Sequence, residues 1–165
     1  MLAGYSTFGI AHAAAGVGAI ILGPLIFLGR KGTVRHTRIG WAYVACMAWV
    51  DGSALAIRRL TGRLNLFHAL AVVSLAMVLA GVGQVVYRRR LRRWLWRHYQ
   101  YMSWSYVGLL AATVNELCVR VPALRSMTDR SGGLLPVAAS AVVVGSSALV
   151  IFRNQRRVIA QVEAP

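Results

Sequence analysis

The sequence predicts an all-α, polytopic membrane protein, because its composition and its apolar segments both suit a bilayer rather than water. Hydrophobic residues make up 58% of the 165-residue chain and charged residues only 14%, whereas soluble domains have about 45–50% and about 25% of these classes. Five segments have about the 20 apolar residues that a helix needs to cross a hydrocarbon core of about 30 Å. Because lipid offers backbone polar groups no partner, helix is the state expected for all five transmembrane segments.

The five predicted helices form one membrane domain, residues 1–165. They cover residues 7–29, 39–57, 66–87, 99–121 and 134–152. We expect the first four to form an up-down four-helix bundle, and the fifth to lie at its periphery after an ordinary linker at 122–133. In the fifth helix, Ala141 and Gly145 are small residues four apart, which would let another helix approach closely, as in a homo-oligomer.

The chain carries 19 Lys and Arg against 4 Asp and Glu, a net charge of +15, and the basic residues lie between the apolar segments. Residues 30–38, 88–97 and 153–157 hold 13 of them, and residues 58–63 and 120–130 hold six. The positive-inside rule therefore predicts an outside N-terminus and a cytoplasmic C-terminus. The expected partner of the arginines is a bilayer with anionic lipids, and nucleic acid is not expected.

One histidine lies near an end of each of the first four helices, so that the four histidines form two layers. With the N-terminus outside, His12 and His68 belong to the outer layer, and His36 and His98 lie at the cytoplasmic end. In an up-down bundle, the two members of each pair would sit on alternate helices, diagonally across the core.

A period of 3.6 residues allows all four histidines to face the inside of the bundle. The inward stripes are His12, Gly16 and Gly23 on the first helix, His36, Gly40, Tyr43, Met47 and Asp51 on the second, His68, Val72 and Leu75 on the third, and His98, Met102, Ser105, Leu109, Thr113 and Glu116 on the fourth. Asp51 and Glu116 fall at about the depth of the outer histidines, and ionisable groups within a membrane have a functional interpretation by default. Two simpler interpretations stay open: an ion pair between Glu116 and Arg120, four residues apart, and contact of the inner histidines with lipid headgroups.

Several short motifs accompany these histidines: His12-x3-Gly16, Gly23-Pro24-x2-Phe27, His36-x3-Gly40-x2-Tyr43, Asn65-x-Phe67-His68, and His98 with Ser105-Tyr106. In these motifs, over about residues 8–122, the chain resembles an uncharacterised group of bacterial membrane proteins, the "domain of unknown function 2306" family. That family has no established activity, so the resemblance implies an architecture rather than a function. In architecture alone, the histidine layers are similar to those of b-561-type dihaem membrane cytochromes, from which the outer carboxylates depart.

The first of three functions compatible with these residues is a bis-histidine dihaem b-type electron carrier with a quinone or another redox partner. It would hold an outer haem on His12 and His68 and an inner haem on His36 and His98. Asp51 and Glu116 would orient the ligating imidazoles. Haem propionates or lipid phosphate would pair with Arg38 and Arg97 inside, or with Arg58 and Arg63 outside.

The second function is a haem-free site in which His12, Asp51, His68 and Glu116 bind zinc, iron or manganese for a hydrolytic or transport role. It leaves His36 and His98 without a role. The third is a non-enzymatic membrane component, such as a small-molecule binder or an assembly subunit. If the chain is an enzyme, a membrane oxidoreductase is the expected class.

Overall fold

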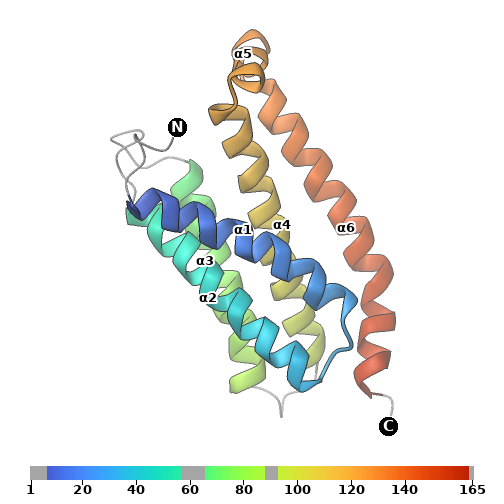
Figure 1. Ribbon diagram of the computed structural model, residues 1–165. Helices are drawn as coiled ribbons and strands as arrows, with labels where there is room; N and C mark the ends of the chain where they lie inside the picture. Colours follow the sequence, from blue (N-terminus) through green and yellow to red (C-terminus); the bar gives the residue numbers. More distant parts are fainter. Residues whose placement is uncertain (1–6, 57–65, 88–92, 164–165) are drawn as a thin grey trace.

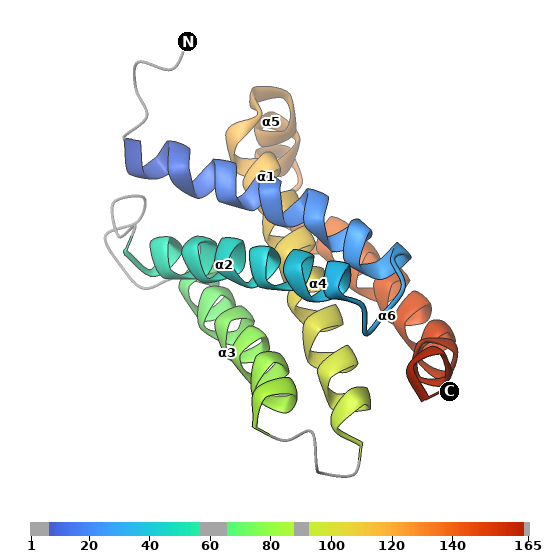
Figure 2. The same ribbon diagram turned by 60° about the horizontal axis from the view of Figure 1, so that its bottom comes forward.

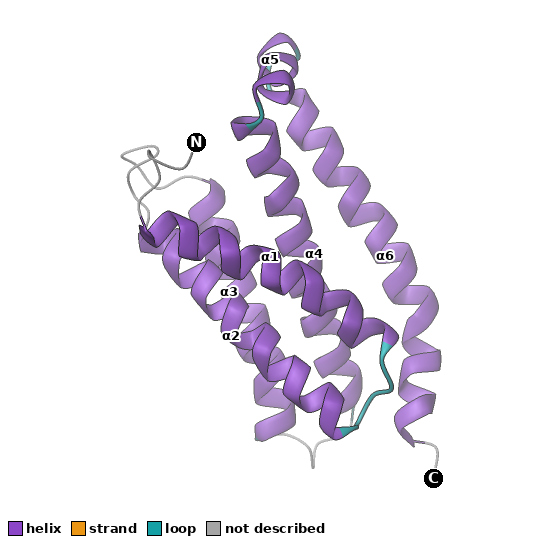
Figure 3. Cartoon of the chain, viewed as in Figure 1, coloured by secondary structure: helices purple, strands orange, loops and turns teal. Residues whose placement is uncertain are grey.

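The computed structural model describes residues 7–56, 66–87 and 93–163, and this part of the chain consists of helices and short connections (Figures 1 and 3). The helices are α1 (Thr7–Leu28), α2 (Val34–Ala56), α3 (Leu66–Val86), α4 (Trp94–Arg120), α5 (Pro122–Arg130) and α6 (Leu134–Glu163). The prediction of an all-α protein is therefore confirmed for the described residues.

Four helices are long and apolar enough to cross a membrane, namely α1, α2, α3 and α6. The remaining predicted span, 99–121, falls within α4, which reaches the same criterion only together with α5, as a pair bent by 91°. The chain thus has four candidate spans, or five if the bent pair counts as one. The lower hydropathy of α4 has a physical reason, because protein rather than lipid surrounds much of this helix.

The prediction of an ordinary linker at 122–133 is wrong, because Pro122–Arg130 form α5. Pro122 lies in the first turn of this helix, where its missing N–H and its fixed φ favour a helix start. The helices α2 and α4 also begin before the predicted residues 39 and 99, at Val34 and Trp94. Hydropathy detects only the apolar part of a helix, so the polar turns that hold His36 and His98 were missed.

α4 is the central helix, and it packs against α3 and α6 as well as α1 and α5. α1 packs against α2, and α2 against α3, so that α1 to α4 close a ring in which the contact between α1 and α4 is the smallest. Figures 1 and 2 show that α1 and α2 lie side by side and cross α4 obliquely. Because of this crossing, the ring encloses space towards both of its ends.

A small apolar core closes the middle of the ring, formed by Ala19, Tyr43, Met47, Val78 and Leu109. Two tyrosines tie the helices together around it. The Tyr43 and Ser105 hydroxyls share a hydrogen bond of 3.0 Å between α2 and α4, and the Tyr106 hydroxyl donates to the Ile20 carbonyl of α1 at 3.1 Å. The Tyr106 ring also occupies the space of a side chain at Gly23, because a Cβ there would overlap the ring. Gly23 thus allows α1 and α4 to meet.

The predicted inward stripes agree with the structure on α2 and α4 and fail on α3. Tyr43, Met47 and Asp51 are buried on α2, as are Ser105 and Leu109 on α4. On α3, however, Val72 is 54% exposed, and the buried residues are His68, Ala71 and Val78. The inward face of α3 therefore continues from His68 by a step of three residues rather than four, which turns Val72 outward.

α6 packs against α4 and, at its start, against α5, and it joins α4 by hydrogen bonds along its whole length. These bonds run from Tyr99 Oη to the Ile151 carbonyl (3.1 Å), from Gln100 Nε2 to Gln155 Oε1 (2.9 Å) and from Asn115 Nδ2 to Ser140 Oγ (2.7 Å). Ala141 and Gly145 are exposed on another face of α6, so their role in a homo-oligomer stays a prediction.

Candidate functional site

Two cavities lie towards opposite ends of the ring, on either side of the core around Tyr43. The basic-end cavity, of about 560 Å³, is lined by the end of α1, the starts of α2 and α4, the end of α3 and one residue of α6. The carboxylate cavity, of about 300 Å³, is lined by α1, α2, α3 and α4 and contains Asp51 and Glu116. Both volumes match ligand sites, which range from about 300 to about 1,000 Å³.

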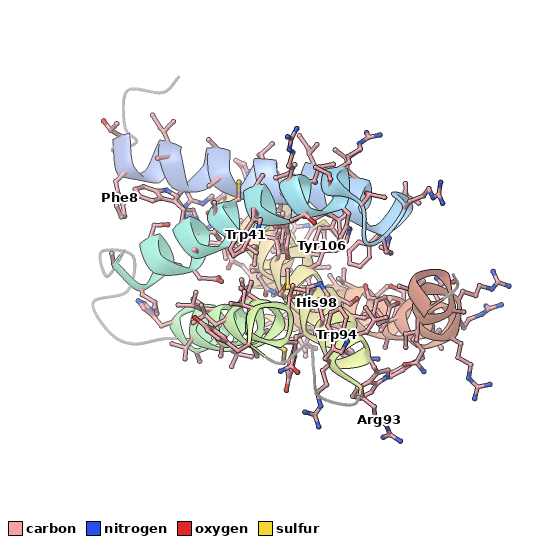
Figure 4. All side chains as sticks on the ribbon, turned by 90° about the horizontal axis from the view of Figure 1, so that it is seen from below. Phe8, Trp41, Arg93, Trp94, His98 and Tyr106 are labelled. Carbon is pink, nitrogen blue, oxygen red and sulfur yellow. The ribbon has the colours of Figure 1, made fainter. Side chains whose placement is uncertain are left out.

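The basic-end cavity contains both histidines of the predicted inner layer, His36 from α2 and His98 from α4. The rest of its wall is mainly apolar and includes the aromatic residues Phe27, Trp41, Trp94 and Tyr99. Seen from this end, His98 lies in the middle of the helices, whereas Arg93 points away from them (Figure 4). The structure therefore brings this predicted pair to one apolar cavity.

His98 is oriented by the backbone of α3. Its Nδ1 lies 2.8 Å from the Gly81 carbonyl oxygen, and a carbonyl only accepts, so Nδ1 carries the hydrogen and Nε2 carries the lone pair of a neutral ring. The contact requires a glycine, because a Cβ on Gly81 would lie 2.6 Å from Met102 Sδ and 3.3 Å from Tyr101 Cβ. α3 and α4 thus meet closely at the residue whose carbonyl fixes His98.

His36 lies in the first turn of α2, where its backbone N–H donates to Thr33 Oγ1 at 3.1 Å, as at a helix N-cap. Its Nδ1 is buried and has no hydrogen-bond partner among the described residues. Lys31 lies beside this ring in the same cavity and donates to the carbonyls of Ile26 and Phe27 in α1 and of Gly29 just after it, at 2.6–2.9 Å. Burial lowers the pKa of the Lys31 ammonium. Its three donors are directed at the C-terminus of α1, so His36 rather than Lys31 offers the cavity a lone pair.

His12 lines the carboxylate cavity and is oriented by α2 in a similar way. Its Nδ1 lies 2.7 Å from Ser53 Oγ, and that hydroxyl donates its own hydrogen to the carbonyls of Trp49 and Val50 at 2.5 and 3.1 Å. Ser53 can therefore only accept from His12, which places the hydrogen on Nδ1 and the lone pair of the neutral ring on Nε2. His12 and His98 share this tautomer.

The two carboxylates of the carboxylate cavity differ in their partners. Glu116 accepts from Arg120 Nε at 2.6 Å, which confirms the ion pair that their spacing allowed. Asp51 is only 4% exposed, and its Oδ2 has no hydrogen-bond partner in the described part of the chain. Ser74 from α3 is a side-chain hydrogen-bonding neighbour of Asp51, and both residues line the cavity. Among the described residues, one carboxylate is therefore paired with a cation and the other is not.

The predicted outer set of His12, Asp51, His68 and Glu116 is brought together only in part. His68 is buried, but it is not among the residues that line the carboxylate cavity. Within residues 7–56, 66–87 and 93–163, no three His, Cys, Asp or Glu side chains lie close enough to hold a metal ion. Arg38 and Arg97 are exposed at the basic end, and Arg58 and Arg63 lie outside the described residues.

Sequence reasoning missed the residues that orient the histidines, Gly81 and Ser53. Neither carries a signal of its own, because small residues in membrane helices usually indicate close helix packing. Their significance depends on partners 17 and 41 residues away in the chain. A search for small or hydroxyl residues facing each histidine could have found candidates, although only the folded structure selects among them.

The chain was compared with family models, curated proteins and solved structures, and none of the three comparisons gave a match. The resemblance to the "domain of unknown function 2306" family therefore stays an expectation. The geometry of the two cavities is the basis for a function.

Proposed function

We propose that the protein is a membrane-bound electron carrier that would bind a b-type haem in the basic-end cavity, where His36 and His98 would hold it. The observation that carries this proposal is the pair of histidines from α2 and α4 at one apolar cavity. Such a haem, when bound, supplies one-electron transfer between its ferric and ferrous states.

The donor set of the cavity fits this group. A ligating histidine almost always donates its other ring N–H to a carbonyl or a carboxylate, and His98 Nδ1 does so to Gly81 at 2.8 Å. The buried Nδ1 of His36 has no hydrogen-bond partner among the described residues, so this ring is not committed to another hydrogen bond there. The mainly aromatic and aliphatic wall offers an apolar macrocycle favourable contacts.

The positive charge at this end supports both the binding of a haem and the orientation of the protein in the membrane. The segments that contribute to this cavity, which are the α1–α2 connection, the starts of α2 and α4 and the last part of α6, also carry basic residues: Arg30, Lys31, Arg35, Arg38, Arg93, Arg97, Arg153, Arg156 and Arg157. Arg38 and Arg97 are the candidates for the propionates. By the positive-inside rule, we infer that this end faces the cytoplasm of a bacterial inner membrane, with the start of α1 outside. A quinone in the bilayer or a redox protein would exchange electrons with the site.

The outer pair supports a second haem less well. His12 and His68 do not line the same cavity, and the carboxylate cavity is the smaller of the two. A haem on His12 and His68 stays a prediction, and the proposal requires only one haem per chain.

Purification from cells supplied with haem precursor, followed by oxidised and reduced visible spectra, tests this function. We expect sharp reduced α and β bands at about one haem per chain, because two imidazoles would hold the haem. His36→Ala and His98→Ala should each abolish the bands, and His12→Ala should leave them unchanged. A colourless wild-type protein, or haem retained in both inner variants, would contradict the proposal.

A further inference from the structure

The polar lining of the carboxylate cavity consists mainly of hydrogen-bond acceptors. Asp51 offers carboxylate oxygens, and the tautomer fixed by Ser53 leaves the acceptor nitrogen on His12. The Thr113 hydroxyl donates its hydrogen to the Leu109 carbonyl at 2.8 Å, so it too can only accept. Ser74 is a side-chain hydrogen-bonding neighbour of Asp51 and lines the same cavity. A ligand that supplies several N–H donors would satisfy this lining.

Among the described residues, the lining of this cavity carries one more carboxylate than it has Lys or Arg side chains. Arg120 is the cation of its lining, and it pairs with Glu116. Asp51 has no such partner among the described residues, and it is buried between the helices α1 to α4. An isolated carboxylate away from water is costly, so a bound cation would stabilise this cavity.

Metal ions match the cavity poorly. Calcium takes six to eight oxygen ligands and magnesium demands near-ideal octahedral geometry, and no group of three or more His, Cys, Asp or Glu in the described ranges could hold a metal ion. The rest of the wall is apolar, with Val17, Ile20, Val50, Leu70, Ala71 and Ala112 among its residues. The lining therefore favours a cation that brings its own apolar body.

We propose that the carboxylate cavity binds an organic ammonium ion with an apolar chain, whose N–H groups donate to Asp51 and its neighbouring acceptors. A primary ammonium has three donors and no acceptor, which complements this lining, and a cavity of about 300 Å³ accommodates a small aliphatic amine. The site goes beyond the electron-carrier function and does not depend on haem in the basic-end cavity.

Equilibrium dialysis of radiolabelled n-hexylammonium against the protein in detergent tests this site, with empty micelles as the blank. At pH 7 the amine is protonated, and we expect saturable binding of one ion per chain. Hexan-1-ol, which has the same apolar chain without the charge, should bind at least about tenfold more weakly. Equal binding of the alcohol would overturn the proposal.

Two substitutions of the same kind assign the binding to Asp51. Asp51→Asn should weaken n-hexylammonium binding at least about tenfold, whereas Asp129→Asn, at an exposed position on α5, should have no effect. Ala112→Phe places a ring in the cavity and keeps the carboxylate, so it should also block binding if Asp51→Asn does not fold. Unchanged binding in a folded Asp51→Asn or Ala112→Phe protein would overturn the proposal. Binding that persists in His98→Ala separates this site from the haem site.

Discussion

The two cavities use the same means of orienting a histidine but present opposite chemistry. At the basic end, the Gly81 carbonyl orients His98 in a mainly apolar cavity that His36 and Lys31 also line. At the other end, Ser53 fixes His12 next to a buried carboxylate whose cavity has its one arginine already paired. The difference shows that a fixed tautomer does not define a site by itself. Under the two proposals, the residues around each histidine determine whether a haem or an ammonium ion binds there.

The largest expected effect is a loss of haem affinity in the basic-end cavity that leaves the carboxylate cavity intact. Gly81→Val places side-chain atoms against Met102 Sδ, which a Cβ alone would already approach to 2.6 Å, and so displaces α4 and with it His98. Loss of an outer hydrogen bond to a ligating histidine lowers affinity about 10–100-fold, and we expect haem affinity to fall by that factor in a titration of the apoprotein. Binding of n-hexylammonium should persist.

Gly83→Val is the control for this experiment, because it introduces the same residue on α3 where a Cβ would meet nothing within 4 Å. It should keep haem affinity near the wild-type value. Equal losses in the two variants would attribute the effect to the helix propensity of valine rather than to His98.

An effect of intermediate size is expected on the stability of the apolar core that separates the two cavities. Gly23→Ala introduces a Cβ that overlaps the Tyr106 ring, and overpacking of this kind typically costs ~1–3 kcal/mol. We expect a lower midpoint of thermal unfolding together with weaker binding in both cavities, because α1 can no longer approach α4. Gly52→Ala, with open space at its Cβ, is the control. Tyr106→Ala added to Gly23→Ala should cost less than the sum of the two single changes, and simple additivity would contradict this packing.

The smallest expected effect is on the n-hexylammonium affinity of the carboxylate cavity. Ser53→Ala removes the acceptor of His12 Nδ1, and a typical hydrogen bond contributes ~0.5–1.5 kcal/mol net. We expect n-hexylammonium affinity to fall about two- to tenfold, measured by equilibrium dialysis, while the haem content stays unchanged. A parallel loss of haem would show that the two ends are coupled rather than separate.

The parts of the fold that depend on local composition were predictable from the sequence. The lengths of the apolar segments predicted the long helices, and the 3.6-residue period predicted the buried faces of α2 and α4. Spacing alone also gave the pair of Glu116 and Arg120. These features depend on residues within one helix, where geometry follows directly from position in the chain.

Features that depend on neighbouring helices were not predictable in this way. Val72 faces outward because the packing of α3 selects the Ala71 side of the helix. α5 was missed because it is short and polar, and hydropathy does not detect such a helix. The outer polar residues were predicted to form one cluster because they lie at about the same depth in their helices. Depth along a helix, however, does not determine which side chains contact one another. His68, at the right depth, is not part of the lining of the carboxylate cavity.

The hydrogen bonds between α4 and α6 have a consequence for the order of events during synthesis. The ribosome completes α4 before α6, and α4 does not by itself reach the apolar character of the other spans. Gln100 and Asn115 obtain partners on another helix only when Gln155 and Ser140 arrive. We therefore expect the translocon to release α4 into lipid together with α6. A nascent chain that stops at Arg130 should stay at the translocon or be degraded.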